Sequence, residues 1–338
     1  MIKIAVDAMG GDNAPSEIVK GAVEAVSERP DITVCLTGQE DIIKKSWKNI
    51  LIKKNRSRSS RPPRSLRLET PGQRHPEEKG FFHCGGNEPG KARRGRRLCF
   101  RRKLRSHFSG RPGDRGKDQR CRAASAGSSD PHGKGFSLLI DCGANVDARP
   151  SHLVQFAQMG SIYMEHVMGV KRPQVAIVNI GAEEEKGNAL VKETFPLLKE
   201  CPGINFIGSI EAREIPHGGA DVIVCEAFVG NVILKLYEGV GATMISMIKK
   251  GMISSLRSKI GALLIKPALK STLKSFDASQ YGGAPLLGLK GLVVKTHGSS
   301  KANEVKNSII QCIAFKEQAI SEKIGQCLSP REEDIKEP

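Results

Sequence analysis

The feature of this sequence that most limits its fold is a repeated unit. A short run of apolar, mostly β-branched residues is followed by a loop of glycine, asparagine and acidic residues, and then by a helical stretch. Such units predict strands that alternate with helices and pair into a mostly parallel sheet. In these sheets, ligands bind at the carboxyl ends of the strands, where the loops gather. The pattern favours an α/β enzyme. The predicted strands are 2–6, 32–36, 136–140, 174–180, 205–207 and 222–225, and the predicted helices span about 16–26, 151–168, 189–200 and a long stretch from 232.

The loops after the strands allow two interpretations. Glycine and asparagine there can simply supply positive φ angles and helix caps. Several such loops at one sheet edge can also form a shared anion site, because backbone N–H groups at helix N-termini attract phosphate. Lys186 is accordingly a solvated lysine or a phosphate ligand, and Asn231 caps the following helix or donates to an oxyanion. His297 precedes a helix that Ser299 or Ser300 would cap, and it is structural or part of a site.

The basic charge of the chain is concentrated in one segment. The formal net charge is +17, but residues 53–132 hold 23 Lys and Arg against 7 Asp and Glu. The other 258 residues carry 30 against 29. The segment has four Leu and no Ile, Val or Met, so it cannot build a core of its own. It also lacks Tyr and Trp for stacking on bases, and we expect no nucleic-acid partner.

Several classes of protein are disfavoured by simple patterns. There is no uninterrupted run of 18 apolar residues, which predicts no membrane-spanning segment, and the first residues do not follow the plan of a signal peptide. Nine cysteines, an odd number without a CxxC pair, indicate reduced thiols in the cytoplasm and offer no zinc-ligand spacing. We find no dinucleotide fingerprint and no serine-hydrolase elbow.

A second basic stretch, residues 239–276, is amphipathic. It has no acidic residue and seven basic ones, with apolar residues at helical spacing between them. The stretch is either a helix pair packed on its own subunit or on a twin, or a surface for anionic lipid or an acidic protein. Both interpretations stay open at this point.

The loops together resemble a known family, the phosphate acyltransferases of bacterial phospholipid synthesis (PlsX). The resemblance covers residues 1–52 and 133 to about 320. The motifs that carry it are Val6-Asp-Ala-Met-Gly-Gly-Asp-Asn-Ala-Pro15, Asp141-Cys-Gly-Ala-Asn-Val-Asp147, Asn179-Ile-Gly-Ala-Glu-Glu-Glu-Lys-Gly-Asn188, Phe228-Val-Gly-Asn231, Tyr281-Gly-Gly-Ala-Pro-Leu-Leu-Gly288 and His297-Gly-Ser-Ser300.

The resemblance implies a fold and a reaction. The fold would be a parallel-sheet α/β/α sandwich like that of phosphotransacetylases and isocitrate/isopropylmalate dehydrogenases. The enzyme, a homodimer in the cytoplasm at the inner face of the membrane, would reversibly convert fatty acyl-[acyl carrier protein] and inorganic phosphate to acyl phosphate. The reaction would require neither a metal nor an organic cofactor. A membrane glycerol-3-phosphate acyltransferase would collect the product. A phosphotransacetylase-like enzyme using acyl-CoA is the alternative, and a basic RNA-binding or membrane-adhering module is a third, disfavoured one.

The resemblance also assigns site residues. Lys186 would orient phosphate, and Asn231 would stabilise the tetrahedral oxyanion or phosphate. The residues expected to line the phosphate and substrate pocket are Asp7, Gly10, Gly11, Asp12, Asn145, Asp147, Asn188, His297, Gly298 and Ser299.

Residues 53–132 interrupt the resemblance and have the composition of coding DNA read out of frame. Permitted codons for residues 80–109, read from the second base of each, allow a helix, a strand and the loop Ser-Ala-Gly-Asn-Ser-Gly that the family carries there. We therefore predict paired frameshifts near 51–55 and 129–133, and an insoluble or inactive protein from the sequence as written. The predicted organisation is βα units of a single catalytic domain (1–52), the out-of-frame segment (53–132), the rest of that domain (133–328) and a tail (329–338).

Overall fold

A computed structural model describes residues 2–55, 66–69, 83–84, 125–132, 135–275, 280, 282–289 and 291–328. Contacts between Cα atoms divide the chain into two compact units. Unit 1 comprises Met1–Ala126, Glu165–Val170 and Ser279–Pro338, and unit 2 comprises Gly127–Met164 and Lys171–Ala278. Most of the segment 53–132 and all of the tail 329–338 lie outside the described residues, so the predicted boundaries stay predictions.

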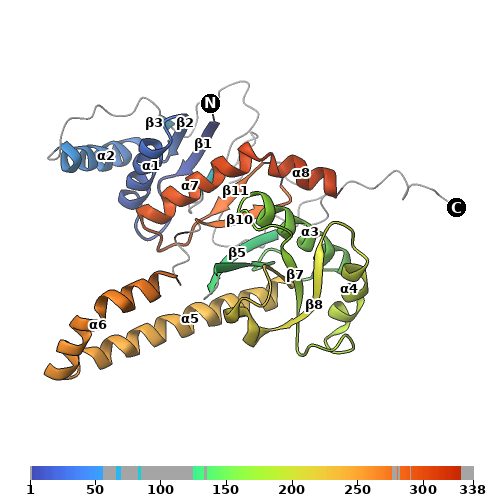
Figure 1. Ribbon diagram of the computed structural model, residues 1–338. Coiled ribbons are helices and arrows are strands. Elements are labelled where there is room, and N and C mark those ends of the chain that lie inside the picture. Colours follow the sequence, from blue (N-terminus) through green and yellow to red (C-terminus); the bar gives the residue numbers. More distant parts are fainter. Residues whose placement is uncertain are drawn as a thin grey trace. The chain divides into compact units, whose positions relative to one another are not determined.

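Unit 1 is an α/β unit built from both ends of the chain (Figure 1). Its strands run in the order β3-β2-β1-β4-β11-β10. All neighbouring pairs are parallel except β10 with β11. The elements are β1 (Ile2–Asp7), α1 (Ser16–Glu28), β2 (Ile32–Thr37), α2 (Glu40–Asn55), β3 (Leu66–Glu69), β4 (His83–Cys84), β10 (Ala284–Leu287), β11 (Val293–Lys295), α7 (Ala302–Glu317) and α8 (Ile320–Cys327).

The close contact between α1 and α7 organises the core of unit 1. Both helices place apolar side chains at helical spacing, and these are fully or almost fully buried, as at Val19, Ala22, Ile309 and Ile313. At Gly21 the two backbones approach so closely that a Cβ atom would lie 2.5 Å from the carbonyl oxygen of Ala302. Glycine is therefore required at this crossing. The first and last parts of the chain are packed together there.

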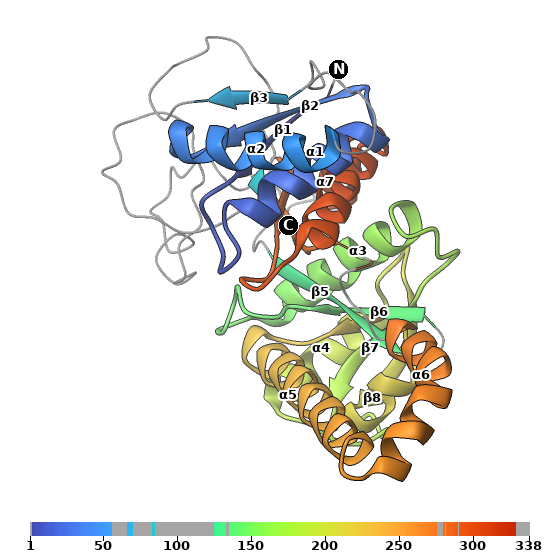
Figure 2. The ribbon, with the colours of Figure 1, turned by 90° about the vertical axis from the view of Figure 1, so that its left-hand side faces the viewer.

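Unit 2 contains a sheet in the order β5-β6-β9-β7-β8, parallel except for the β5–β6 hairpin (Figure 2). The first two residues of β5, Ser125 and Ala126, belong to unit 1 and pair with β10. The elements are β5 (Ser125–His132), β6 (Gly135–Ile140), α3 (Pro150–His166), β7 (Gln174–Asn179), α4 (Ala189–Lys199), β8 (Asn205–Glu211), the 3-10 helix η2 (Ala212–His217), β9 (Val222–Val224), α5 (Ala227–Met252) and α6 (Leu256–Ser275).

The strands of unit 2 bury both of their faces, which explains their continuous apolar runs. Leu138 and Ile140 face α3, where a Cβ atom on Gly160 would come within 3.4 and 3.6 Å of their side chains. Leu139 points to the opposite face of the sheet and belongs to a core cluster that includes Ile223. Ile233 of α5 packs against this cluster. The alternation of period two thus places α3 and the start of α5 on opposite faces.

Helices α5 and α6 form a hairpin that leaves the sheet at the start of α5 (Figures 1 and 2). Its apolar side chains, such as Met247, Leu256 and Leu264, are exposed, so the described residues do not support packing of this stretch on its own unit. By length and composition alone, α5 could cross a membrane, and 6% of its most apolar window is buried. The criterion of an uninterrupted apolar run does not select α5, because Lys235 and Glu238 interrupt it.

The observed elements confirm the predicted α/β pattern, with two corrections. The predicted strand 205–207 extends to Glu211 and pairs with β7 except at a bulge at Ile207. The long helix begins at Ala227 rather than at 232, because Glu226 caps it. Asn231 therefore lies in the second turn of α5 and is not its cap.

Candidate functional site

Three polar loops of unit 2 begin at the same edge of the sheet. Strands β6, β9 and β7 are adjacent and parallel. Ile140 and Val224, the last residues of β6 and β9, lie side by side, and Val224 lies beside Ile177, two residues before the end of β7. The loops 141–147 and 180–188 follow β6 and β7 directly, and after β9 the short connection 225–226 leads into the first turns of α5. The sequence prediction that these loops gather at the carboxyl ends of the strands is confirmed within this unit.

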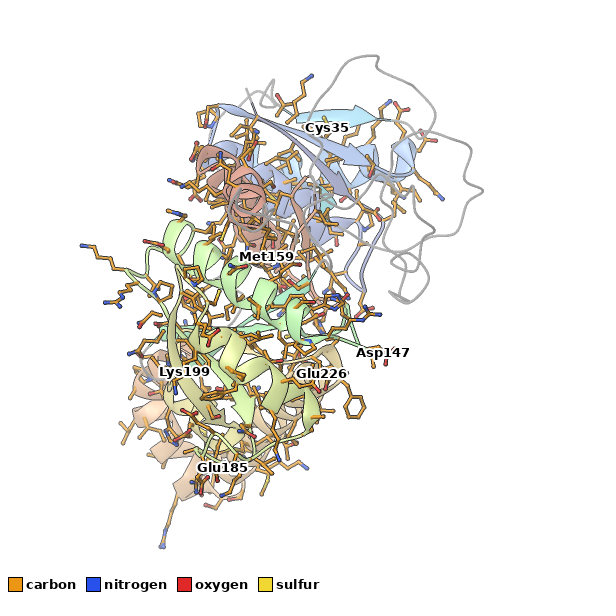
Figure 3. The ribbon with its side chains drawn as sticks, turned by 90° about the vertical axis from the view of Figure 1, so that its right-hand side faces the viewer. Cys35, Asp147, Met159, Glu185, Lys199 and Glu226 are labelled. Atoms are coloured by element: carbon orange, nitrogen blue, oxygen red, sulfur yellow. The ribbon has the colours of Figure 1, made fainter. Side chains whose placement is uncertain are left out.

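The buried carboxylate of Asp141 fixes the first loop. Its Oδ1 accepts the N–H groups of Gly143 and Ala144, each at 3.0 Å. Its Oδ2 accepts the backbone N–H of Asn145 at 2.8 Å and the side-chain amide of Asn145 at 2.7 Å. These four bonds compensate for burying a charge and hold Asn145 in one position. Asp147 lies farther along the loop and is exposed at the surface (Figure 3).

The second loop, after β7, is held by Asn179. Its side-chain amide donates to the carbonyl of Lys186 at 3.1 Å and to the hydroxyl of Ser209 at 3.0 Å. The ammonium of Lys186 forms an ion pair with Glu183 at 2.8 Å, and its stem lies over Gly181, where a Cβ atom would be 2.6 Å from Lys186 Cδ. The hydrogen bond from Lys186 holds the pKa of Glu183 below its ordinary range.

Asn188, predicted to line a pocket, is the N-cap of α4. Its Oδ1 accepts the backbone N–H of Val191 at 2.9 Å. This is the capping role that asparagine fills at helix starts. The structure thus gives Asn188 a local structural role, and the part it plays toward substrate stays a prediction.

The start of α5 lies against the first loop. The backbone N–H of Ala227 donates to the carbonyl of Asn145 at 3.1 Å, and Figure 3 shows Asp147 and Glu226 on the same side of unit 2. The carboxylate of Glu226 accepts the N–H groups of Phe228 at 2.5 Å and Val229 at 2.9 Å. Asn231 follows one turn later with an exposed side chain.

These caps correct one expectation about anion binding. The sequence interpretation relied on free N–H groups at helix starts, but Glu226 and Asn188 already accept such groups at α5 and α4. At these two helix starts, an anion would compete with the caps for the N–H groups of Val191, Phe228 and Val229.

In unit 1 the structure brings together the loop that follows β1, residues 8–15, and the loop 296–301 before α7. The backbone N–H of Asp12 donates to the carbonyl of Gly298 at 2.7 Å. The side chain of Asn13 donates to the carbonyls of Ser299 at 2.9 Å and Ser300 at 3.3 Å. Gly11 has a φ of +95°, and a Cβ there would lie 2.9 Å from the Gly298 carbonyl oxygen. Glycine is thus required at this contact.

Two other residues predicted for the site, Asp7 and Gly10, lie where this N-terminal loop begins. The carboxylate of Asp7 accepts the backbone N–H of Met9 at 2.9 Å, which fixes the turn that enters the loop. Gly10 is buried.

His297 is oriented by its own loop. The backbone N–H of Ser299 donates to His297 Nδ1 at 3.3 Å, and the Ser299 hydroxyl lies 2.8 Å from the same nitrogen. A nitrogen that accepts an N–H carries no proton, so the neutral ring has its proton on Nε2. The prediction that Ser299 or Ser300 caps α7 was wrong. Lys301 is the N-cap residue, and the N–H of Ala302 donates to Glu17 of α1 at 3.0 Å.

The structure adds residues that were not predicted for the site. Asp141, Asn179, Glu226 and Asn13 hold the loops, and the first three share a sequence signal, a polar residue within two positions of a strand end. Within the described ranges, no group of three His, Cys, Asp or Glu side chains could hold a metal ion.

Comparison with known proteins connects this geometry to one family. A sequence profile of the family described as "Fatty acid synthesis protein" matches residues 2–60 and 119–323. The chain is 41% identical over 342 residues to a phosphate acyltransferase of Alkaliphilus oremlandii, covering 98% of this chain and 99% of that protein. It is 39% identical over 348 residues to a phosphate acyltransferase of Brevibacillus brevis, covering 97% of each.

Solved structures support the fold. A phosphotransacetylase from Streptococcus pyogenes superimposes with a TM-score of 0.54 at 12% identity, covering 93% of this chain and 94% of that chain. The EutD phosphotransacetylase from Staphylococcus aureus gives 0.52 at 13%, covering 96% and 94%. The predicted phosphotransacetylase-like α/β fold is confirmed.

Proposed function

Because the chain belongs to the fatty acid synthesis protein family and its curated relatives are phosphate acyltransferases, we propose that it transfers a fatty acyl group from acyl carrier protein to inorganic phosphate. A phosphate oxygen attacks the thioester carbonyl carbon, forming a C–O bond. The C–S bond then breaks, and the thiolate leaves and takes up a proton. The products are acyl phosphate and free carrier protein, and the step is reversible.

The observation that carries this proposal is the convergence of three polar loops at the ends of β6, β9 and β7 in a family of acyltransferases. The reaction needs mainly positioning of phosphate and stabilisation of the tetrahedral oxyanion. We assign Lys186 to phosphate and Asn231 to the oxyanion or the phosphate. Both side chains are exposed, Lys186 in the loop after β7 and Asn231 in the second turn of α5, the helix that follows β9.

The test is release of carrier-protein thiol as a function of phosphate concentration. Lys186→Met should lower kcat/KM for phosphate by roughly 100-fold, the scale expected when a charge-stabilising group is removed. Lys199→Met is the matched control, because Lys199 forms a similar exposed ion pair with Glu184 at 3.0 Å and should leave the rate unchanged. Preference for acyl-CoA over acyl carrier protein would favour the phosphotransacetylase-like alternative. Thiol release independent of phosphate would overturn the proposal.

We assign the α5–α6 hairpin to the membrane surface and to the acidic carrier protein. Its exposed apolar side chains alternate with exposed basic ones such as Lys259 and Lys266, the composition of helices that lie on anionic lipid. The enzyme would then work in the cytoplasm at the inner face of the membrane. Co-sedimentation with vesicles tests this. Binding to anionic but not zwitterionic vesicles is expected, and equal binding to both would contradict it.

The same hairpin is our candidate for the contact between two copies of a homodimer. One chain has a mass of 36.6 kDa, and light scattering of the purified enzyme should give twice that mass. A monomer would contradict the assignment.

A membrane glycerol-3-phosphate acyltransferase would collect the acyl phosphate, whose mixed anhydride is labile in water.

A further inference from the structure

Three large apolar side chains of unit 2 are exposed at the edge of the sheet that carries the polar loops. They are Val146 after β6, Phe228 after β9 and Ile180 after β7, with exposed fractions of 43, 65 and 79%. Their strands are parallel neighbours in the sheet, and β7 extends two residues beyond the last pair it forms with β9. Val146 and Phe228 each follow a member of the hydrogen-bonded pair Asn145 and Ala227, so their backbones lie side by side.

The loops themselves hold these side chains exposed. The backbone N–H of Ile180 donates to the buried Asn179 side chain at 2.8 Å, and the N–H of Phe228 donates to Glu226. The loop that bears Val146 is fixed by the four hydrogen bonds to Asp141. Exposing such side chains costs hydrophobic free energy, and a loosely held loop would turn them inward. Because polar groups hold the backbone, the exposure is built into the fold.

Apolar side chains beside a few fixed polar groups are typical of sites for ligands that have an apolar body and a polar end. We propose that Val146, Ile180 and Phe228 bind the hydrocarbon chain of the acyl donor, next to the loops that bear Lys186 and Asn231. This inference rests on the proposed acyl transfer and adds the substrate feature that these residues recognise. They contact the chain and not the reacting atoms, so they set preference for chain length.

The experiment measures binding of acyl-pantetheine thioesters with 4, 8, 12 and 16 carbons to the full protein expressed from its gene, by titration calorimetry below their micelle concentrations. Affinity should rise with chain length. Phe228→Asp and Ile180→Asp should each weaken binding of the 16-carbon thioester about tenfold, the equivalent of one lost apolar side-chain contact, and leave the 4-carbon thioester unchanged. Aspartate is compatible with the first turn of α5, so the helix should keep its start.

Matched controls separate this role from a general effect of surface charge. Leu197 and Ile207 are 45 and 44% exposed in the same unit, on α4 and β8, and Leu197→Asp and Ile207→Asp should keep the chain-length dependence. Phe228→Leu should keep it as well, because the side chain stays apolar. Equal loss in the controls, or no loss in Phe228→Asp and Ile180→Asp, would overturn the inference.

Two further outcomes are informative. If the wild-type protein binds none of the thioesters and releases no thiol with phosphate, the proposed function fails. If it transfers acyl groups without any dependence on chain length, only the present inference fails. A change in molar mass of Phe228→Asp in light scattering would make these residues a contact between copies of the chain and would also overturn it.

Discussion

The side-chain amide of Asn13 donates to the carbonyl of Ser299 at 2.9 Å, a contact between residues 286 positions apart. A second bond reaches the carbonyl of Ser300 at 3.3 Å. Together they hold the His297–Ser300 loop against the first loop of the chain. Asp7, Gly10, Gly11 and Asp12 on one side and His297, Gly298 and Ser299 on the other were predicted for the site, and Asn13 is the side chain that ties the two segments together.

Asn13→Ala should loosen the loop that it holds. Losing about 1 kcal/mol of hydrogen bonding would speed amide exchange at Ser300 roughly fivefold, because local opening becomes that much easier. Hydrogen-exchange mass spectrometry over residues 297–300 measures this. Asn205→Ala is the control, since its side chain donates to the carbonyl of Arg172 in unit 2. Unchanged exchange in Asn13→Ala would mean that other contacts hold the loop.

Asp141→Asn should destabilise the protein by about 2 kcal/mol. The buried carboxylate of Asp141 accepts four hydrogen bonds, and the amide NH2 group of asparagine would place a donor against the N–H donors that now point at a carboxylate oxygen. Denaturant unfolding monitored by circular dichroism gives the free energy. Asp147→Asn, an exposed change in the same loop, should stay within about 0.5 kcal/mol. Equal effects from both would show that burial of Asp141 is unimportant.

Gly21→Ala should lower the free energy of unfolding, and Gly239→Ala should raise it. The added Cβ at Gly21 meets the backbone and side chains of α7, and overpacking of this kind costs about 1–3 kcal/mol. This exceeds the gain of about 0.5–1 kcal/mol from replacing glycine within a helix. At Gly239, in α5, the added atom meets open space, so only the gain remains. Thermal unfolding measures both effects: the melting temperature should fall in Gly21→Ala and rise in Gly239→Ala.

The ion pair of Lys186 and Glu183 should show in a pH titration. The pKa of Glu183 is lowered in the folded protein, so the pair stabilises the fold above the ordinary carboxyl range, and the contribution is lost as pH falls through the lowered value. Lys186→Met removes the donor and should raise the titration midpoint of Glu183, read from its carboxyl carbon by NMR. Lys199→Met should leave that midpoint in place.

The reading frame that encodes residues 53–132 can be tested by resequencing the gene. We propose that paired frameshifts produced this segment, and the interruption of the family match between residues 60 and 119 supports the proposal. Resequencing should reveal compensating single-base changes, and a chain with the restored frame should be soluble and active where the written chain is not. Soluble, active protein made from the written sequence would contradict this.

Strand–loop–helix order was predictable because each unit carries its own apolar pattern and turn residues. Strands β1, β2, β6, β7 and β9 and helices α1, α3 and α4 were predicted to within two residues, whereas β8 was predicted too short and β10 and β11 were not predicted. Helix starts were harder. Glu226 was not recognised as a cap because glutamate is uncommon there, and α7 receives a cap from Glu17, a residue that no local window contains.

The site was predictable as a set of loops but not as a set of contacts. Asp141 follows β6 directly and Asn179 ends β7, yet only the folded chain shows that their polar atoms hold Asn145 and Lys186. The sequence pattern identified exposed residues such as Lys186 and Asn231 and overlooked the buried Asp141 and Asn179, which orient the loops.

The pairing of α1 with α7 has a consequence for synthesis on the ribosome. Residues 127–164 and 171–278 form unit 2 almost without interruption, so that unit can fold while the chain is still growing. The N-terminal helix is made first, but its face at Gly21, which meets Ala302 and Val305 of α7, stays uncovered until nearly the whole chain has been translated. The earliest part of the nascent protein is therefore among the last to reach its native packing.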